Sequence, residues 1–168
     1  MPRSFDMVAE YLGSVAQVHQ AFCDKDYWLA RLAKARADIS TLDSIADDGQ
    51  GGTDITTIQT MRAPGLPAVA TQFHRGDLSV VREEHWGPVV DGRTIGTVRG
   101  RIPGAPVIIT GTGVLTPYER GARLNFSATV EVRIPLVGGK LESLMGQHVK
   151  YLVELEQEFT TEWISARH

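Results

Sequence analysis

The stretch that decides the fold is residues 137–168, VGGKLESLMGQHVKYLVELEQEFTTEWISARH. Most gaps between its apolar side chains are three or four residues, which predicts a helix with one apolar face. The predicted apolar stripe consists of Leu141, Met145, His148, Leu152, Leu155, Phe159 and Trp163. An unbroken helix over this stretch would be roughly 40 Å long at 1.5 Å per residue. Such a wide apolar face must be covered, and the segments before it are strand-like, so its partner should be a sheet.

The rest of the chain supplies the strands of that sheet. Seven segments alternate between apolar and polar side chains or are rich in β-branched residues, which predicts strands at residues 4–12, 37–46, 53–62, 78–86, 94–102, 107–116 and 123–133. Two short helices are expected after the first strand, one capped by Ser14 with Gln17 in the capping-box position, the other by Asp24 or Asp26. Residues 67–76 fit either a short helix or an irregular crossing.

This order predicts one α+β domain over residues 1–168. Strands that follow one another through short turns favour an antiparallel meander, and only one long helix is available to cover its core face. We therefore expect a strongly twisted, curved antiparallel sheet wrapped around the C-terminal helix. Glycines inside predicted strands allow bends and leave side chains out of the concave interior; they are Gly96, Gly100, Gly111 and Gly113.

The order of elements, with PLVGGKLE (residues 135–142) opening the terminal helix, resembles the START-like superfamily. This superfamily, also called SRPBCC, includes the START, polyketide cyclase and birch-pollen-allergen-like domains. The chain is similar to an uncharacterised bacterial branch of it, a domain of unknown function, over nearly its whole length. The resemblance implies a helix-grip fold with a cavity between sheet and helix. It also implies binding of lipids, sterols, polyketides or other apolar molecules, or cyclisation or dehydration chemistry. No catalytic motif carries over residue by residue.

Composition and charge narrow the classes of function. The net charge is -3, and the lysines and arginines are dispersed, so nothing indicates nucleic-acid binding. The single cysteine, Cys23, forms no internal disulfide and is interpreted as an inert core thiol. The first residues lack the apolar run of a signal peptide, and no window approaches ~18 consecutive apolar residues. We therefore expect a cytoplasmic protein without integral membrane association; the sequence leaves its oligomeric state open.

Motifs for metals, cofactors and nucleophiles are missing from the sequence. The five histidines show no metal-ligand spacing, and no second ligand is adjacent to Cys23. The glycines of residues 49–52 lack the lysine and the helix of a phosphate loop, and no GxSxG motif occurs. We predict no metal and no cofactor.

The predicted ligand site lies between residues 107–115, residues 124–132 and the helix face of residues 141–155, with residues 63–76 covering its mouth. Its predicted ligand-binding residues are Leu141, Met145, His148, Leu152, Phe126, Ala128, Val130, Ile109, Trp86, Arg82 and Arg99. His148 is a polar residue on the apolar stripe and needs a partner. It is interpreted either as a polar anchor or acid/base in the pocket, or as a histidine bonded to a strand carbonyl or exposed at the helix edge.

The segment 78–86 also has two interpretations. Leu78 and Val80 share a face with Arg82 and Glu84, so in the first interpretation the charged pair points inward, where Arg82 and Arg99 hold an acidic head group. Alternatively, these charges form cross-strand ion pairs on a solvated face. A one-residue slip in register would exchange the two faces.

Three functions remain open. The first is binding, for transport or sequestration, of a small hydrophobic or amphipathic ligand such as a lipid or polyketide-like molecule. The second is a cyclase or dehydratase that uses His148, Glu84 or Tyr118 as its acid or base. The third is a packed protein-interaction module without an open pocket, whose exposed apolar patch would lie around Trp28.

Overall fold

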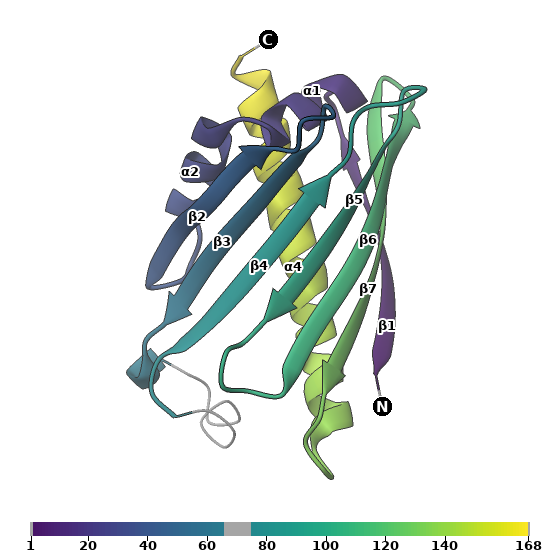
Figure 1. The fold of residues 1–168 in the computed structure, drawn as a ribbon. Coiled ribbons are helices and arrows are strands. Elements are labelled where there is room, and N and C mark those ends of the chain that lie inside the picture. Colours follow the sequence, from purple (N-terminus) through teal and green to yellow (C-terminus); the bar gives the residue numbers. More distant parts are fainter. Residues whose placement is uncertain (1, 66–74, 168) are drawn as a thin grey trace.

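The computed structural model describes residues 2–65 and 75–167 as a curved, unclosed antiparallel sheet with one long helix along its concave face (Figure 1). The strands are β1 (Arg3–Tyr11), β2 (Ile39–Asp47), β3 (Thr53–Met61), β4 (Leu78–Trp86), β5 (Thr94–Arg101), β6 (Val107–Tyr118) and β7 (Gly121–Val132). The helices are α1 (Val15–Phe22), α2 (Lys25–Ala33), the 3-10 turn η1 (Ala63–Gly65) and α4 (Gly138–Ser165). The strand order is β1-β7-β6-β5-β4-β3-β2, so the first strand lies beside the last. This confirms the predicted helix-grip architecture.

The two short helices begin where the sequence predicts. Ser14 and Gln17 form a reciprocal capping box: the Gln17 amide donates to Ser14 Oγ at 3.2 Å, and the Ser14 amide donates to Gln17 Oε1 at 2.9 Å. Asp24, rather than Asp26, caps α2 by accepting the Asp26 amide at 2.8 Å. Both helices lie at the end of the sheet where α4 finishes, and they cover that end of the interior (Figure 1).

Strand β2 departs from the predicted alternation. A regular alternation would place Ile39, Thr41, Asp43 and Ile45 on one face, but the pairing with β3 shifts between Leu42 and Ser44. The extra residue of this bulge exchanges the two faces of the strand. As a result Leu42 and Ile45 both pack against the core, whereas Ile39 is exposed.

Helix α4 is rotated relative to the predicted stripe. It packs on β1 and β7, and its buried residues are Gly138, Leu141, Glu142, Gly146, Thr160 and Ile164. Leu155 is exposed, which contradicts its place on the predicted apolar stripe, and His148 is exposed, which contradicts its interpretation as a pocket residue and agrees with the alternative of a histidine at the helix edge. The reason is that this helix buries small and hydrogen-bonded residues as well as apolar ones. Glu142 Oε2, for example, accepts the Val132 amide at 2.9 Å and thereby joins the start of α4 to the end of β7.

The interior glycines do not leave an empty interior. The ring of Trp86 lies over Gly96 and the ring of Phe126 lies over Gly111, so a Cβ at Gly96 or Gly111 would clash with an aromatic side chain. At Gly113 an added Cβ would meet Leu124 Cδ1 at 2.9 Å and the Phe126 ring at 3.2 Å. These three glycines make room for apolar side chains, which corrects the expectation that they hollow the sheet. At Gly100 the nearest atom to an added Cβ is Ile109 Cβ, 3.6 Å away, so space remains there.

Candidate functional site

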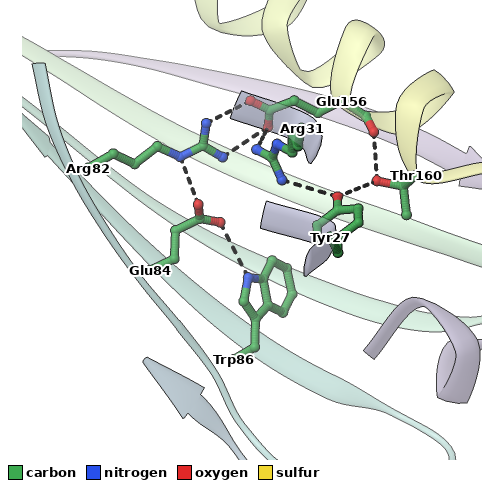
Figure 2. Close-up of polar contacts among 7 residues, drawn as sticks. All are labelled: Tyr27, Arg31, Arg82, Glu84, Trp86, Glu156 and Thr160. Atoms are coloured by element: carbon green, nitrogen blue, oxygen red, sulfur yellow. Dashed lines mark hydrogen bonds and ion pairs between the residues drawn. The ribbon is translucent and has the colours of Figure 1, made fainter. Parts of the chain in front are cut away.

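Two arginines and two glutamates meet on the inner side of the sheet (Figure 2). Arg82 of β4 reaches Glu156 of α4 through two parallel hydrogen bonds: Nη1 donates to Oε2 at 2.7 Å, and Nη2 donates to Oε1 at 2.9 Å. Arg31 of α2 forms an ion pair with the same carboxylate. Arg82 Nε lies 3.0 Å from Oε2 of Glu84, its neighbour on β4. We call Arg31, Arg82, Glu84 and Glu156 the charge cluster; it connects α2, α4 and β4.

A chain of hydroxyl groups extends the charge cluster along α4. Thr160 Oγ1 donates to the Glu156 carbonyl oxygen at 2.7 Å, which leaves the Thr160 oxygen to accept from the Tyr27 hydroxyl at 2.6 Å. The Tyr27 oxygen in turn accepts from Arg31 Nη1 at 3.3 Å. Tyr27 and Thr160 are fully buried, so each polar atom has its partner in the protein.

Aromatic rings hold the charged side chains in place. Trp86 Nε1 donates to Glu84 Oε1 at 3.3 Å, and the guanidinium of Arg31 lies over the Trp28 ring, 4.5 Å from its centroid. Trp28 is itself fixed, because its Nε1 donates to the Phe22 carbonyl at 2.8 Å. The charge cluster is thus part of a rigid, packed wall rather than a mobile surface network.

The electrostatics keep Arg31, Arg82 and Glu156 ionised. Burial lowers the pKa of Arg82 and of Arg31, but Glu156 together with the other neighbouring groups outweighs burial, and both pKa values rise above that of free arginine. Burial raises the pKa of Glu156, but the combined effect of Arg31 and Arg82 is larger and brings this pKa down to about 2. A general acid or base works best with a pKa near the working pH. These shifts lead away from neutrality, so Arg31, Arg82 and Glu156 hold charge rather than exchange protons.

The structure places most of the predicted sheet residues on the inner face. Ala128 and Val130 are buried in the core, Phe126 covers Gly111, Trp86 covers Gly96, and Ile109 lies next to Gly100. From α4, Leu141 is buried, and Met145 and Leu152 are partly buried. Arg82 and Glu84 point inward, so the solvated-face alternative is wrong for these two residues.

Two predicted site residues, and one candidate acid or base, lie elsewhere. Arg99 pairs with Glu83 across β4 and β5 and is exposed on the convex face, so it does not join Arg82, whose neighbour on β5 is Gly100. His148 is exposed on α4, with its ring 6.4 Å from that of Tyr151. Tyr118 lies at the turn between β6 and β7 under the guanidinium of Arg123. The loop predicted to cover the mouth lies largely outside the described residues, because residues 66–74 are not among them.

Sequence reasoning missed Arg31, Tyr27, Glu156 and Thr160. One signal was available: Glu142, Gly146, Glu156 and Thr160 recur at helical spacing on one side of α4, beside the apolar stripe. A hydropathy pattern treats that side as solvent-exposed. Only the inward arginine on β4 supplies the reason for a glutamate there, because a buried guanidinium requires a counter-charge.

Several inner side chains around the buried Gly100 remain partly accessible. Arg82 and Ile109 flank Gly100 in register on β4 and β6, and Val80 and Val98 are their neighbours on the same face. All four side chains point inward, yet each remains only partly buried. We call these five residues the Gly100 region. It offers apolar surface next to the charge cluster, and 25% of the Arg82 side chain is exposed.

Two hollows occur among the described residues. One, of about 320 Å³, is formed by α2 and β2, with Leu29, Leu32 and Leu42 in its wall. The other, of about 540 Å³, is a depression on the convex face of β3 to β6, where His85 Nδ1 lies 2.7 Å from Asp54 Oδ1, and Glu84 and Val98 also contribute to its wall. Neither is lined by α4, so the inner site is an accessible surface around Gly100 rather than a large enclosed cavity among the described residues.

The described residues show no metal site and no membrane span. Within residues 2–65 and 75–167, no three histidine, cysteine, aspartate or glutamate side chains come together as metal ligands. In the same part of the chain, no helix has the length and apolar character needed to cross a membrane.

Comparison with known proteins identifies the family. A family described as "Protein of unknown function (DUF2505)" matches residues 6–164. The chain belongs to the DUF2505 family. An uncharacterised protein of Mycobacterium tuberculosis H37Rv is 51% identical to this DUF2505 chain over 171 residues, which is 98% of each chain.

Solved structures show that this DUF2505 chain has the START-like helix-grip fold. The Zhui aromatase/cyclase of Streptomyces sp. R1128 is 8% identical, with a TM-score of 0.61 over 99% of this chain and 96% of that one. A START superfamily protein of Mycobacterium smegmatis is 11% identical, with a TM-score of 0.55 over 98% and 99% of the two chains. At such low identity the similarity concerns the fold alone.

Proposed function

We propose that this protein binds a small hydrophobic or amphipathic molecule, such as a lipid or polyketide-like compound, between the sheet and α4. The ligand would lie on the Gly100 region, with Arg82 at its polar end. The observation that carries the proposal is the set of inward-pointing, partly exposed side chains beside a fixed guanidinium. Ligand sites are typically apolar surfaces with a few well-placed polar groups, and this region has that composition.

The site is preorganised, which favours binding. Arg82 is fixed by Glu156 and Glu84, so little side-chain entropy is lost when a ligand contacts it. Helix α4 and the strands β4 to β6 provide the walls, and the aromatic rings near Trp86 close the end of the interior toward α1 and α2. The aromatase/cyclase and the START superfamily protein with this fold support the choice of ligand class.

The geometry gives less support to the other two functions. Of the three candidate acids and bases, only Glu84 lies in the interior; His148 is exposed and Tyr118 lies at a turn. The packed-module alternative expected an exposed patch around Trp28, but this ring is buried under Arg31. We therefore place binding first.

Native mass spectrometry of the purified protein, followed by analysis of its organic extract, tests the proposal. We expect a bound species above the mass of the bare chain and the same species in the extract. Titration with the uncharged apolar dye Nile red covers the case of a ligand lost during purification. A bare mass together with no saturable dye binding would contradict the proposed function.

A substitution at Gly100 tests the location of the site. Gly100→Leu adds an apolar side chain where a Cβ meets only ordinary contacts, so the fold should be retained and the region filled. We expect the dye affinity to fall at least about tenfold, since the added side chain occupies the volume of the ligand. Thr97→Leu, on the exposed convex face of the same strand, is the matched control and should bind like the wild type. Equal affinities for both variants would place the ligand elsewhere.

A further inference from the structure

We propose that the charge cluster selects an uncharged ligand with a carbonyl or hydroxyl oxygen and rejects a carboxylate. This inference rests on the proposed function and specifies the chemistry of its ligand. It differs from the acidic head group that the sequence alone suggested for Arg82 and Arg99. Three features of the charge cluster support it: its charges are balanced, Arg82 keeps unused N–H donors, and two glutamates lie next to Arg82.

The charge cluster is electrically balanced before any ligand arrives. Arg31 and Arg82 carry two positive charges, and Glu84 and Glu156 carry two negative charges. Both carboxylates contact Arg82 itself, one at Nε and the other across both terminal nitrogens. Arg31 is also occupied, because it pairs with Glu156 and donates to Tyr27. No guanidinium in the charge cluster therefore lacks a counter-charge.

Arg82 nevertheless keeps hydrogen-bond donors for a neutral acceptor. A guanidinium has five N–H groups, two on each terminal nitrogen and one on Nε. Glu156 takes one from each terminal nitrogen, and the Nε group faces Glu84. This leaves one N–H on each terminal nitrogen, on a side chain that is 25% exposed and lies opposite Gly100 in register. A carbonyl or hydroxyl oxygen can accept from these groups without disturbing the ion pairs.

A carboxylate at the same place would meet two negative groups. Glu84 is buried, with only 3% of its side chain exposed, and Glu156 lies directly across Arg82. A third negative charge would have to displace one of them or be desolvated without a counter-charge of its own. Both cost free energy in a poorly solvated site. A neutral oxygen avoids this cost, so the charge cluster discriminates between the two ligand classes.

The test compares undecan-2-one with decanoate, in which a carboxylate replaces the methyl ketone on the same alkyl chain. At about pH 8 decanoate is fully ionised. Each compound displaces Nile red from the intact protein. We expect the ketone to compete at a concentration at least about tenfold lower than decanoate. Equal competition, or stronger competition by decanoate, would overturn the inference while leaving the proposed function intact. Dye binding that neither compound reduces would overturn both, since the region would then not accept small amphiphiles.

A charge variant shows whether the charge cluster causes the selectivity. Glu84→Gln removes one negative charge, and its amide oxygen still accepts from Trp86 Nε1, so the fold should be retained. The charge cluster then carries a net positive charge, and the preference for the ketone should shrink at least about threefold. Glu83→Gln, the adjacent exposed residue on the convex face, is the matched control and should keep the wild-type ratio. A ratio that is unchanged in Glu84→Gln, or that changes equally in both variants, would contradict the assignment.

Discussion

At the scale of single residues, Glu156 illustrates how a charged side chain becomes part of a core. Its carboxylate is shared by Arg31 and Arg82, and its backbone carbonyl accepts from Thr160. Both ion pairs depend on the carboxylate being ionised and in place. Without it, two guanidinium groups would face each other inside the sheet, because Glu84 contacts only one of them.

Glu156→Gln should therefore destabilise the protein by about 3 kcal/mol, since it leaves buried charge uncompensated. The free energy of unfolding, measured by urea titration at neutral pH, checks this value. Glu158→Gln, an exposed glutamate on the same helix, is the matched control and should change stability by less than about 0.5 kcal/mol.

The same variant should alter the response to acid. The pKa of Glu156 lies at about 2 in the folded protein and near 4.5 when the chain is unfolded. Its stabilising effect is complete above the unfolded value and is lost as the pH falls from about 4.5 toward about 2. Over that range the wild type should lose more stability than Glu156→Gln. Parallel losses in the two proteins would show that Glu156 is not the group that titrates.

Strand alternation offered the inward direction of Arg82 and Glu84 as one of two interpretations, and it did not give their partners. The apolar residues Leu78 and Val80 indicate which alternate residues of β4 face the interior, and Arg82 and Glu84 belong to the same set. The turns of α2 and α4 that face β4 depend on how the helices dock, which no local pattern specifies. The prediction that Arg99 lies beside Arg82 was wrong for a related reason: the register of β5 against β4 sets Gly100, not Arg99, opposite Arg82.

At the scale of elements, α4 shows why the hydropathy pattern predicted the position of a helix correctly but its buried face wrongly. The apolar stripe predicted its length and position well. The buried face is offset because Gly146 allows close approach to the ring of Phe5 on β1, and because Glu142 and Thr160 form hydrogen bonds when buried. Size and hydrogen bonding decided the orientation, and a scale of hydrophobicity measures neither.

Two identical substitutions on α4 should therefore have opposite effects. A Cβ at Gly146 would clash with the Phe5 ring, so Gly146→Ala should destabilise the protein by about 1–3 kcal/mol. At Gly139 the nearest atom is Arg3 Nη2 at 3.5 Å, and Gly139→Ala should stabilise the helix by up to about 1 kcal/mol. Thermal unfolding of both variants checks the pair. A stability gain in Gly146→Ala would show that α4 does not approach β1 this closely.

At the scale of the whole molecule, the sheet has a well-protected side and an open side. Strand β7 is hydrogen-bonded to β1 and β6, and α4 covers its inner face. Strand β2 is an edge strand with a bulge, and most of its residues are exposed. The sequence predicted the antiparallel meander from its short turns, but it did not specify which strand would close against β1.

Amide hydrogen exchange should reflect this asymmetry. We expect the amides of β7 to exchange slowest and those of β2 to exchange much faster, since edge strands open without global unfolding. Mass spectrometry of peptides after timed exchange resolves the two strands. Equal protection of β2 and β7 would indicate that another chain or segment covers the β2 edge.

The pairing of β1 with β7 also determines when the sheet can be completed during synthesis of the protein. Arg3 pairs with Val130 and Tyr11 pairs with Ala122, so β1 is synthesised well before its partner β7 and must wait for it. Until then β1 lacks its neighbouring strand, a state prone to wrong association. The sheet is therefore completed late in synthesis. Helix α4 begins shortly after β7, and its Glu142 then binds the end of that strand.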